Sequence, residues 1–501
     1  MSSISTSSST ASANAALQSA AQSIISGSTG NSSMDVSTLV TALVNAKTAG
    51  QTAALAARQT TDNTTLSAYG ALSSALSALQ SGITNLANGT TLSTFAATAS
   101  GTGLTATAGV GAVAGSYSVA VTQIASSQAL SSAAFSSTTQ LGTGTLSISL
   151  GGKSMDINVD GTNNTLSGIA SAINASSSNP GVTATIVTGT DGAHLVLRAA
   201  NTGAANVINV TTSNITTDNG LSSLGVTSTA STTGGQSTIT SANAGSAWTQ
   251  SGFAQDAEFT VGGIAASSST NAVTSAIAGV TMNLTSASAG TTQTLTIAAD
   301  TTSQNTAINN FVSLYNTVVT TMSTLTSFSS GSSSQGPLLG DSTLQTIKNT
   351  LATIIGGSVG SGSTGTTLAA IGISLKDDPA DGTLVVDNTA LNTALTSSPA
   401  TVASLFNSTN GIAEQLNSSI TTFTQTGGII GSRNTALNAD LKSITTQQTA
   451  LADYTTQLTN QYQAQFTALN TLMATMNNNS QYLTALFGGT NSAGALATNK
   501  G

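Results

Sequence analysis

Few residues in this chain have side chains that could carry out chemistry, and their spacing does not fit a catalytic centre. The 501 residues include no Cys and one His, His194. The lack of Cys excludes disulfides, thiol nucleophiles and thiolate metal sites, and one His cannot supply a multi-histidine metal centre. His194 alternates with Leu195 and Leu197, so we expect it on the solvent face of a strand. We therefore expect no enzymatic activity and no bound cofactor or metal.

A group of aspartates between residues 377 and 387 raises the question of a calcium site. Its members are Asp377, Asp378, Asp381 and Asp387. An EF-hand loop needs an oxygen ligand at its third position and Glu at its twelfth, but Pro379 and Asn388 stand there. The pair Asp381-Gly382 instead fits the tight turn of a hairpin within residues 368–391.

The remaining motifs and the overall charge give no ligand site either. The segment 109–115 (GVGAVAG) has the spacing GxGxxxG, which is not that of a dinucleotide-binding loop. With 5% charged residues and a net charge of −8, the chain has no basic surface for phosphates, so nucleic acid is not an expected partner. Residues 211–250 are rich in Ser, Thr and Gly and are interpreted as a linker or long loop, with Trp248 as a local packing anchor.

Helices at both ends of the chain must provide most of the architecture. Near the N-terminus, one heptad series consists of Tyr69, Leu72, Leu76, Leu79, Ile83 and Leu86. Residues 433–487 contain no Gly or Pro, and a second series runs through them: Leu437, Leu441, Ile444, Leu451, Leu458, Tyr462, Leu469, Leu472, Met476, Leu483 and Leu486. This predicts a helix about 80 Å long in a left-handed coiled coil. Its partner would be residues 36–86 or copies from other subunits.

Four polar residues interrupt the second series: Gln448, Thr455, Gln465 and Asn479. Polar groups at such positions reduce stability and set register or oligomeric state. They could also permit reversible loosening of the helices.

Between the helical ends, apolar residues alternate with polar ones, which is typical of strands. Such segments are found at 116–124, 145–150, 155–159, 182–186 and 195–197, and again at 257–261, 280–284 and 294–298. Short helices are predicted near 166–173, 308–318 and 344–354. The fold class is therefore α+β, with long terminal helices forming a coiled-coil stalk and inserted β-rich domains.

This pattern predicts four parts. Residues 1–34 form a disordered N-terminal tract, since they lack periodic apolar residues. Residues 35–95 with 301–501 form the helical stalk and leg domain, including the small hairpin. Residues 96–135 with 250–300 form one β-rich domain. Residues 136–249 form an inserted β-rich domain and the linker.

Several segments, taken in order, resemble bacterial flagellar filament cap proteins, a family of hook-associated proteins. They include MDVSTLVTALVNAK (34–47), AGSYSVAVTQIASSQAL (114–130), GTGTLSISLGG (142–152), GPLLGDSTLQTI (336–347) and QFTALNTLMATMNNNSQYL (465–483). The resemblance covers about Met34 to Phe487.

The resemblance implies a homo-oligomeric ring at the distal tip of the flagellum. There it would promote folding and insertion of exported flagellin and prevent its loss to the medium. The implied partners are flagellin, the hook–filament junction protein, the flagellar type III export apparatus and an export chaperone. The implied location is extracellular, reached without a cleaved signal peptide. This agrees with an N-terminus that lacks a charged segment followed by an apolar core, and no apolar run is long enough for membrane insertion.

Two alternatives remain at this stage. Another flagellar axial protein, either the junction protein or flagellin, would also place helices at both ends around a β insertion. A secreted adhesin that binds glycans would also suit Ser/Thr-rich β domains.

Overall fold

The structure is a computed structural model that describes residues 36–330, 335–360, 365–407 and 409–487, together with Gln18 and Gln22. The tract predicted to be disordered, 1–34, lies outside these residues apart from the two glutamines. The chain forms two compact units. The helical unit comprises residues 1–88, 307–394 and 398–501, and the β unit comprises 89–306 and 395–397. The four-part division expected from the sequence is finer than this and stays a prediction.

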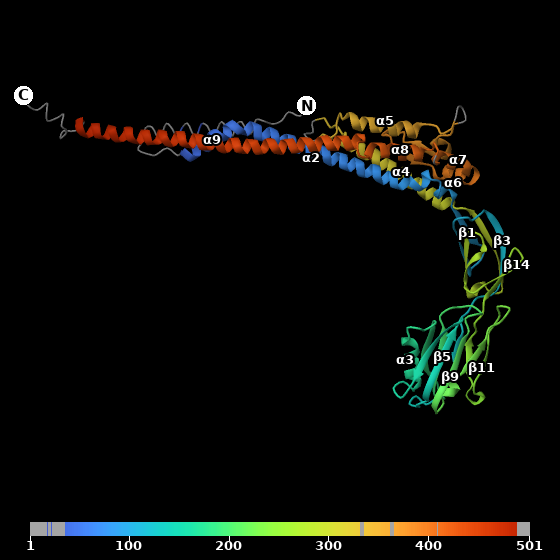
Figure 1. Ribbon diagram of the computed structural model, residues 1–501. Helices are drawn as coiled ribbons and strands as arrows, with labels where there is room; N and C mark the ends of the chain where they lie inside the picture. The colour runs from blue at the N-terminus through green and yellow to red at the C-terminus, as the bar shows by residue number, and fades with distance from the viewer. Residues whose placement is uncertain are drawn as a thin grey trace, which may run out of the picture. The chain divides into compact units, whose positions relative to one another are not determined.

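Two long helices dominate the helical unit, α2 (Val36–Ala87) and α9 (Ile429–Phe487). Figure 1 shows them side by side. They run antiparallel, because Arg58 of α2 contacts Asp440 while Val44, closer to the N-terminus, packs with Leu458. The other helices are α4 (Thr301–Leu325), α5 (Ser342–Gly356), α6 (Asn388–Ser397), α7 (Pro399–Phe406) and α8 (Ile412–Thr424).

Two aspartate caps and one glycine determine where several of these helices begin or how closely they pack. Asp341 accepts hydrogen bonds from the backbone N–H groups of Thr343 and Leu344 and so caps α5. Asp387 caps α6 in the same way through Thr389 and Ala390. Gly82 of α2 faces Leu314 of α4, where a Cβ would lie 2.2 Å from the leucine Cδ1, so glycine permits the close approach of these two helices.

The predicted hairpin is present as β18 (Ile373–Leu375) and β19 (Leu384–Val386), which pair antiparallel. A short 3₁₀ helix, Leu368–Ile371, precedes it. In its turn, Asp381 accepts from the N–H and the hydroxyl of Thr383. The aspartate group therefore serves a turn and a helix cap, which agrees with the interpretation of Asp381-Gly382.

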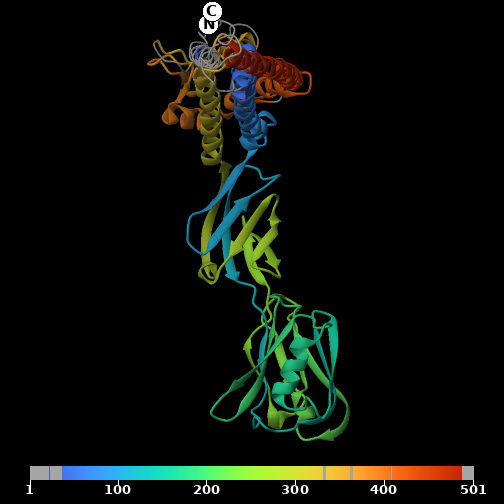
Figure 2. The ribbon, with the colours of Figure 1, turned by 90° about the vertical axis from the view of Figure 1, so that its left-hand side faces the viewer.

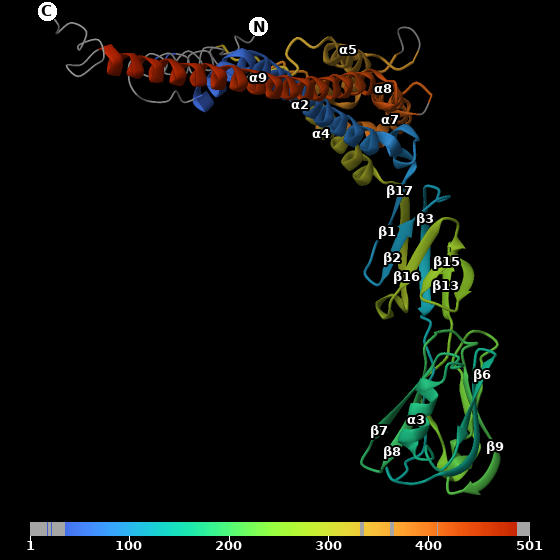
Figure 3. The ribbon, with the colours of Figure 1, turned by 60° about the vertical axis from the view of Figure 1, so that its left-hand side comes forward.

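The first core of the β unit lies between two antiparallel sheets (Figure 3). One sheet has the order β1-β17-β3-β13-β14 and the other β15-β16-β2. Their strands are β1 (Phe95–Ala99), β2 (Leu104–Ala108), β3 (Gly115–Gln123), β13 (Ala257–Val261), β14 (Ile264–Ser268), β15 (Ala272–Ile277), β16 (Val280–Leu284) and β17 (Thr291–Ala299). The period-two pattern positions the inward residues, for example Val119 and Val121 of β3.

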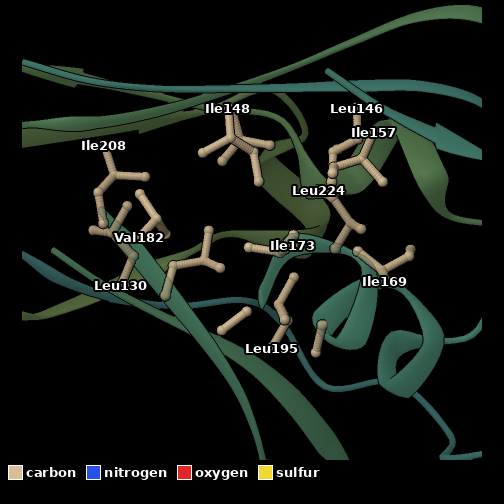
Figure 4. Packing of buried hydrophobic residues seen from close by; sticks show 14 of the residues in the cluster. Leu130, Leu146, Ile148, Ile157, Ile169, Ile173, Val182, Leu195, Ile208 and Leu224 are labelled. Carbon is tan, nitrogen blue, oxygen red and sulfur yellow. The ribbon is translucent and has the colours of Figure 1, made fainter. Parts of the chain in front are cut away.

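The second core of the β unit is formed by residues inserted between β3 and β13. Its sheets have the orders β11-β10-β9-β5-β6 and β12-β4-β8-β7, and α3 (Leu166–Ala175) packs mainly on β7 (Figure 2). The strands are β4 (Ala129–Ser131), β5 (Gly142–Leu150), β6 (Lys153–Val159), β7 (Val182–Thr188), β8 (Ala193–Ala199), β9 (Ile208–Asp218), β10 (Val226–Thr229), β11 (Thr238–Ser241) and β12 (Thr249–Gly252). Figure 4 shows the leucine and isoleucine side chains from both sheets and α3 meeting in this core.

The interpretation of residues 211–250 as a linker is wrong. The segment continues β9, forms β10 and β11 and enters β12, with the 3₁₀ helices Leu221–Leu224 and Ala244–Ser246 between them. Its few apolar residues, such as Leu224 and Val226, are buried in the second core, as is Trp248. Polar residues between them pair locally: the Ser228 hydroxyl donates to the Ile208 carbonyl at 2.6 Å. A polar composition therefore does not exclude regular secondary structure in this segment. The predicted role of Trp248 as a packing anchor is confirmed.

Candidate functional site

The N-terminal heptad residues lie inside the helical unit. All six, Tyr69, Leu72, Leu76, Leu79, Ile83 and Leu86, are 0% exposed. Their part of α2 packs against α8 as well as α9, so these residues belong to the core of a helical bundle. Whether they also act in assembly stays a prediction.

The C-terminal heptad residues divide into three groups along α9. Ile444 and Leu458 are buried. Five residues are partly covered: Leu437, Leu441, Leu451, Tyr462 and Leu486. Four are exposed: Leu469 at 43%, Leu472 at 57%, Met476 at 63% and Leu483 at 55%. The exposed group lies toward the C-terminal end of α9, where it reaches and then passes the N-terminal end of α2.

The contact between the two helices departs from the predicted heptad series after Tyr462. Phe466 and Met473 pack against Leu39 near the start of α2, whereas the predicted positions are Gln465 and Leu472. An α-helix has 3.6 residues per turn, so a straight helix drifts by roughly 20° per heptad and the contacting face moves on by one residue. The sequence does carry a signal for this shift, because the aromatic residues Tyr462 and Phe466 are four positions apart and so lie on one face of the helix. In the structure the centroids of their rings are 6.5 Å from each other.

Two of the polar residues in the series have hydrogen-bond partners. Gln448 donates its side-chain amide to Oε1 of Gln59 on α2 at 3.1 Å. The Thr455 hydroxyl donates to the Leu451 carbonyl of its own helix at 2.7 Å. Such pairing limits the destabilisation that polar groups between helices would otherwise cause. Gln465 and Asn479 are exposed.

A charged group joins α2 to α9 at the middle of their contact. Arg58 donates to both carboxylate oxygens of Asp440, at 2.8 and 3.2 Å. Asp62 lies nearby, and burial together with the Asp440 carboxylate raises its pKa. In a chain with only 5% charged residues, this group provides one of the few electrostatic restraints on helix register.

A second charged group joins α5 to α9. Arg433 donates to Oδ2 of Asp341 at 3.3 Å, and the Asp341 side chain is 11% exposed. Burial acts to raise the pKa of Asp341, but the N–H groups of Leu344 and Thr343, the neighbouring Tyr69 hydroxyl and the Arg433 charge together lower it below its ordinary value. The Asp341 carboxylate therefore caps α5 and also interacts with Arg433 of α9 and Tyr69 of α2.

His194 is more covered than the sequence predicted. Its ring nitrogens contact the Ser132 carbonyl at 2.7 Å and Oδ1 of Asp191 at 3.1 Å, and its side chain is 20% exposed. The Ser132 carbonyl and Asp191 raise the pKa of His194, while the histidine lowers that of Asp191. His194 lies on the expected face, opposite the buried Leu195 and Leu197, but it is only partly exposed because its ring contacts the segment that pairs with β8 at Ser132.

The described residues contain no grouping of three or more His, Cys, Asp or Glu side chains suited to a metal ion. Nor does any helix within the described ranges have the length and apolar character needed to cross a membrane.

Three family models match the chain. The flagellar hook-associated protein 2 N-terminus matches residues 32–128, its C-terminus matches 254–478, and the flagellin hook IN motif matches 145–201. The flagellar hook-associated protein 2 of Escherichia coli K12 is 33% identical over 447 residues, which are 86% of this chain and 91% of that protein. The B-type flagellar hook-associated protein 2 of Pseudomonas aeruginosa is 32% identical over 438 residues, 86% of this chain and 90% of that one.

A solved structure of a flagellar cap protein is also similar to this chain. The crystal structure of the D1-D2-D3 domains of the flagellar cap protein FliD from Escherichia coli is 32% identical, with a TM-score of 0.56. The match covers 74% of this chain and 99% of that one.

Proposed function

The chain belongs to the flagellar hook-associated protein 2 family, and we propose that it caps the distal end of the flagellar filament. The observation that carries this proposal is similarity across 86% of the chain and 91% of the relative. The family models match residues 32–128, 145–201 and 254–478, which include parts of both long helices and of the β unit.

In this role the protein acts outside the cell through surface complementarity. Copies of the chain form a ring at the filament tip, and flagellin subunits fold and insert beneath it. We assign the stalk and legs to residues 35–95 with 301–501, and the plate to the β-rich parts 96–135 with 250–300 and 136–249. The hook–filament junction protein provides the first attachment site, and the flagellar type III export apparatus, with an export chaperone, delivers the chain.

The composition supports assembly without catalysis. A chain with 5% charged residues forms contacts that do not depend on matching ion pairs, so a ring can shift between equivalent positions on the filament. The free energy for each step comes from folding and burial of flagellin. The buried heptad residues of α2 and α9 hold each leg together during these steps.

Deletion of the gene tests the proposal. We expect abundant unpolymerised flagellin in cell-free medium, few filaments by electron microscopy, and recovery of filaments when the purified full-length protein is added. A useful control is the purified protein after heat denaturation, which should restore nothing. Normal filaments in the deletion strain would refute the cap function and would favour a secreted adhesin.

A further inference from the structure

The outer edge of β7 directs a row of backbone groups away from its sheet. β7 is the last strand in the order β12-β4-β8-β7, so β8 is its only neighbour in the sheet. At one end of this pair the Ala200 N–H donates to the Gly181 carbonyl at 2.9 Å, and at the other the Gly189 N–H donates to the Gly192 carbonyl at 2.7 Å. Bonded and non-bonded positions alternate along an antiparallel pair, so the odd-numbered residues of β7 bond to β8. The even-numbered residues therefore direct their N–H and C=O groups outward: Val182, Ala184, Ile186 and Thr188.

Two asparagine side chains cover the first half of this edge. Asn179 donates its amide to the Val182 carbonyl at 2.7 Å and accepts from the Val182 N–H at 2.8 Å. Asn174 of α3, which lies beside β7 (Figure 3), makes the same two bonds to Ala184 at 2.7 and 2.9 Å. A carboxamide has an N–H donor and a C=O acceptor, as a peptide group does. The edge therefore already binds two peptide-like groups, one after the other.

The second half of the edge is open. Among the residues that the structure describes, none hydrogen-bonds to the outward N–H and C=O groups of Ile186 and Thr188. Val187 between them is 52% exposed, on the face opposite the core. By contrast, β6, at an edge of the other sheet, carries the exposed charges of Lys153 and Asp156. Charged side chains commonly prevent pairing at an edge, and the β7 edge lacks them.

This open edge, residues 186–188, suits an extended polypeptide segment. Its two N–H and two C=O groups can bind a main chain of almost any sequence, as in strand addition to a sheet. Ile186, which is only partly buried against the second core, and the exposed Val187 offer apolar contacts on the two faces of the sheet. Residues 176–190 contain no charged side chain, so the edge favours an uncharged segment.

The size of the open edge identifies the kind of partner. Three strand residues extend over roughly 10 Å. A stable interface between subunits buries about 1,000 Å² or more, which so short an edge cannot provide. Four hydrogen bonds between main chains instead give a weak contact that forms and breaks readily. The edge thus fits a segment that binds and then leaves, and not a permanent contact between copies of the chain.

We propose that the open edge of β7 binds an extended, uncharged segment of flagellin before that segment folds. The bound segment forms an additional strand beside β7, and it leaves when its main-chain groups find partners within the folding flagellin. This inference rests on the proposed cap function, which makes flagellin the client. It adds which surface of the cap holds the unfolded chain.

Site-specific photo-cross-linking of the full-length protein tests the contact. Val187→p-benzoylphenylalanine places the reactive group at the open half of the edge. The matched control is Thr183→p-benzoylphenylalanine, an exposed position on the same face of β7 beside the covered half. The probe is flagellin freshly diluted from urea, compared with folded flagellin. We expect several-fold more product at position 187 than at position 183 with unfolded flagellin, and none at either position with folded flagellin.

Other patterns would overturn the proposal. Equal yields at the two positions, or no product, would mean that the open edge is not a binding site. Products with folded flagellin would mean that a folded surface is bound, and dimers of the chain itself would mean that copies pair through β7. Filament recovery in the deletion strain separates this inference from the cap function. Recovery without the cross-link would refute the edge contact alone, whereas no recovery with the native protein would refute the cap function, and with it flagellin as the client.

A proline variant measures the backbone contribution. Thr188→Pro removes one outward N–H and leaves the bonds to β8 in place, and proline is tolerated at strand edges. The yield of cross-linking at position 187 should fall by about fivefold, which is about 1 kcal/mol for one hydrogen bond. Thr188→Val keeps the N–H and should give the native yield. An unchanged yield in Thr188→Pro, with native Trp248 fluorescence, would refute recognition through the main chain.

Hydrogen exchange of the native protein tests the open edge without any substitution. The amides of Ile186 and Thr188 should exchange faster than those of Val182 and Ala184, which the asparagine side chains protect. Slow exchange at Ile186 and Thr188 would mean that the edge is covered in solution and would overturn the proposal.

Discussion

Replacement of Asp341 should destabilise the helical unit and leave the β unit unchanged. The carboxylate of Asp341 caps α5 through Thr343 and Leu344 and accepts from Arg433 of α9. Asp341→Ala removes both interactions. Asp341→Asn keeps a side-chain oxygen for the helix cap and removes only the negative charge.

The magnitude follows from these contacts. Loss of an N-cap side chain costs about 1 kcal/mol. The ion pair adds at most about 1 kcal/mol, because Arg433 is half-exposed and water screens the interaction. The free energy of unfolding should therefore fall by about 1–2 kcal/mol in Asp341→Ala and by less than about 1 kcal/mol in Asp341→Asn.

The effect of Asp341→Asn should depend on pH in a definite direction. The pKa of Asp341 is lowered in the folded protein, so its ionised form stabilises the fold. This stabilisation is complete above the unfolded pKa, about 3.9, and is lost as the pH falls through the lower folded value. The difference between the native protein and Asp341→Asn should thus be constant from pH 7 to about 5 and should disappear in stronger acid.

The two units can be followed separately during urea denaturation. Far-UV circular dichroism at the helix minimum reports mainly the helical unit, while fluorescence of the single Trp, Trp248, reports the β unit. We expect the first transition to shift and the second to stay in place. Asp377→Asn is the control, because Asp377 is an exposed member of the aspartate group. Equal shifts of both transitions, or a difference that persists in strong acid, would refute the reasoning.

Four further substitutions have distinct expected outcomes. Leu76→Ala removes a fully buried side chain and should cost about 2–5 kcal/mol in the helical transition, whereas Met476→Ala should cost almost nothing in the monomer. His194→Ala should destabilise the β unit more in acid than in base, because folding raises the pKa of the histidine. The stabilisation by His194 is complete below its ordinary pKa, near 6.5, and is lost as the pH rises through the folded value. Urea denaturation followed by Trp248 fluorescence from pH 5 to 8 would measure this difference. Gly142→Ala should move the Trp248 transition strongly or prevent folding, since the glycine has φ of +116° and an added Cβ would lie 1.9 Å from the Thr217 carbonyl oxygen; an unchanged transition would contradict this geometry.

The sequence alone determined the features that depend on local spacing. Alternating residues such as Val119 and Val121 identified strands, and the segment 433–487 identified a single long helix. The α+β fold class, with terminal helices around inserted β domains, was therefore predictable. So was the interpretation of the aspartate group, since one turn and one helix cap account for Asp381 and Asp387. Order and spacing of longer segments identified the cap family.

Tertiary structure decided which residues meet. The heptad series indicated Leu472, but the drift of a straight helix brings Phe466 and Met473 to α2 instead. Residues 211–250 fold because β9 and β12 pair with β5 and β4, which are distant in the chain, and the His194 ring contacts the Ser132 carbonyl. Periodicity describes one helix at a time, whereas burial depends on every segment that packs against it.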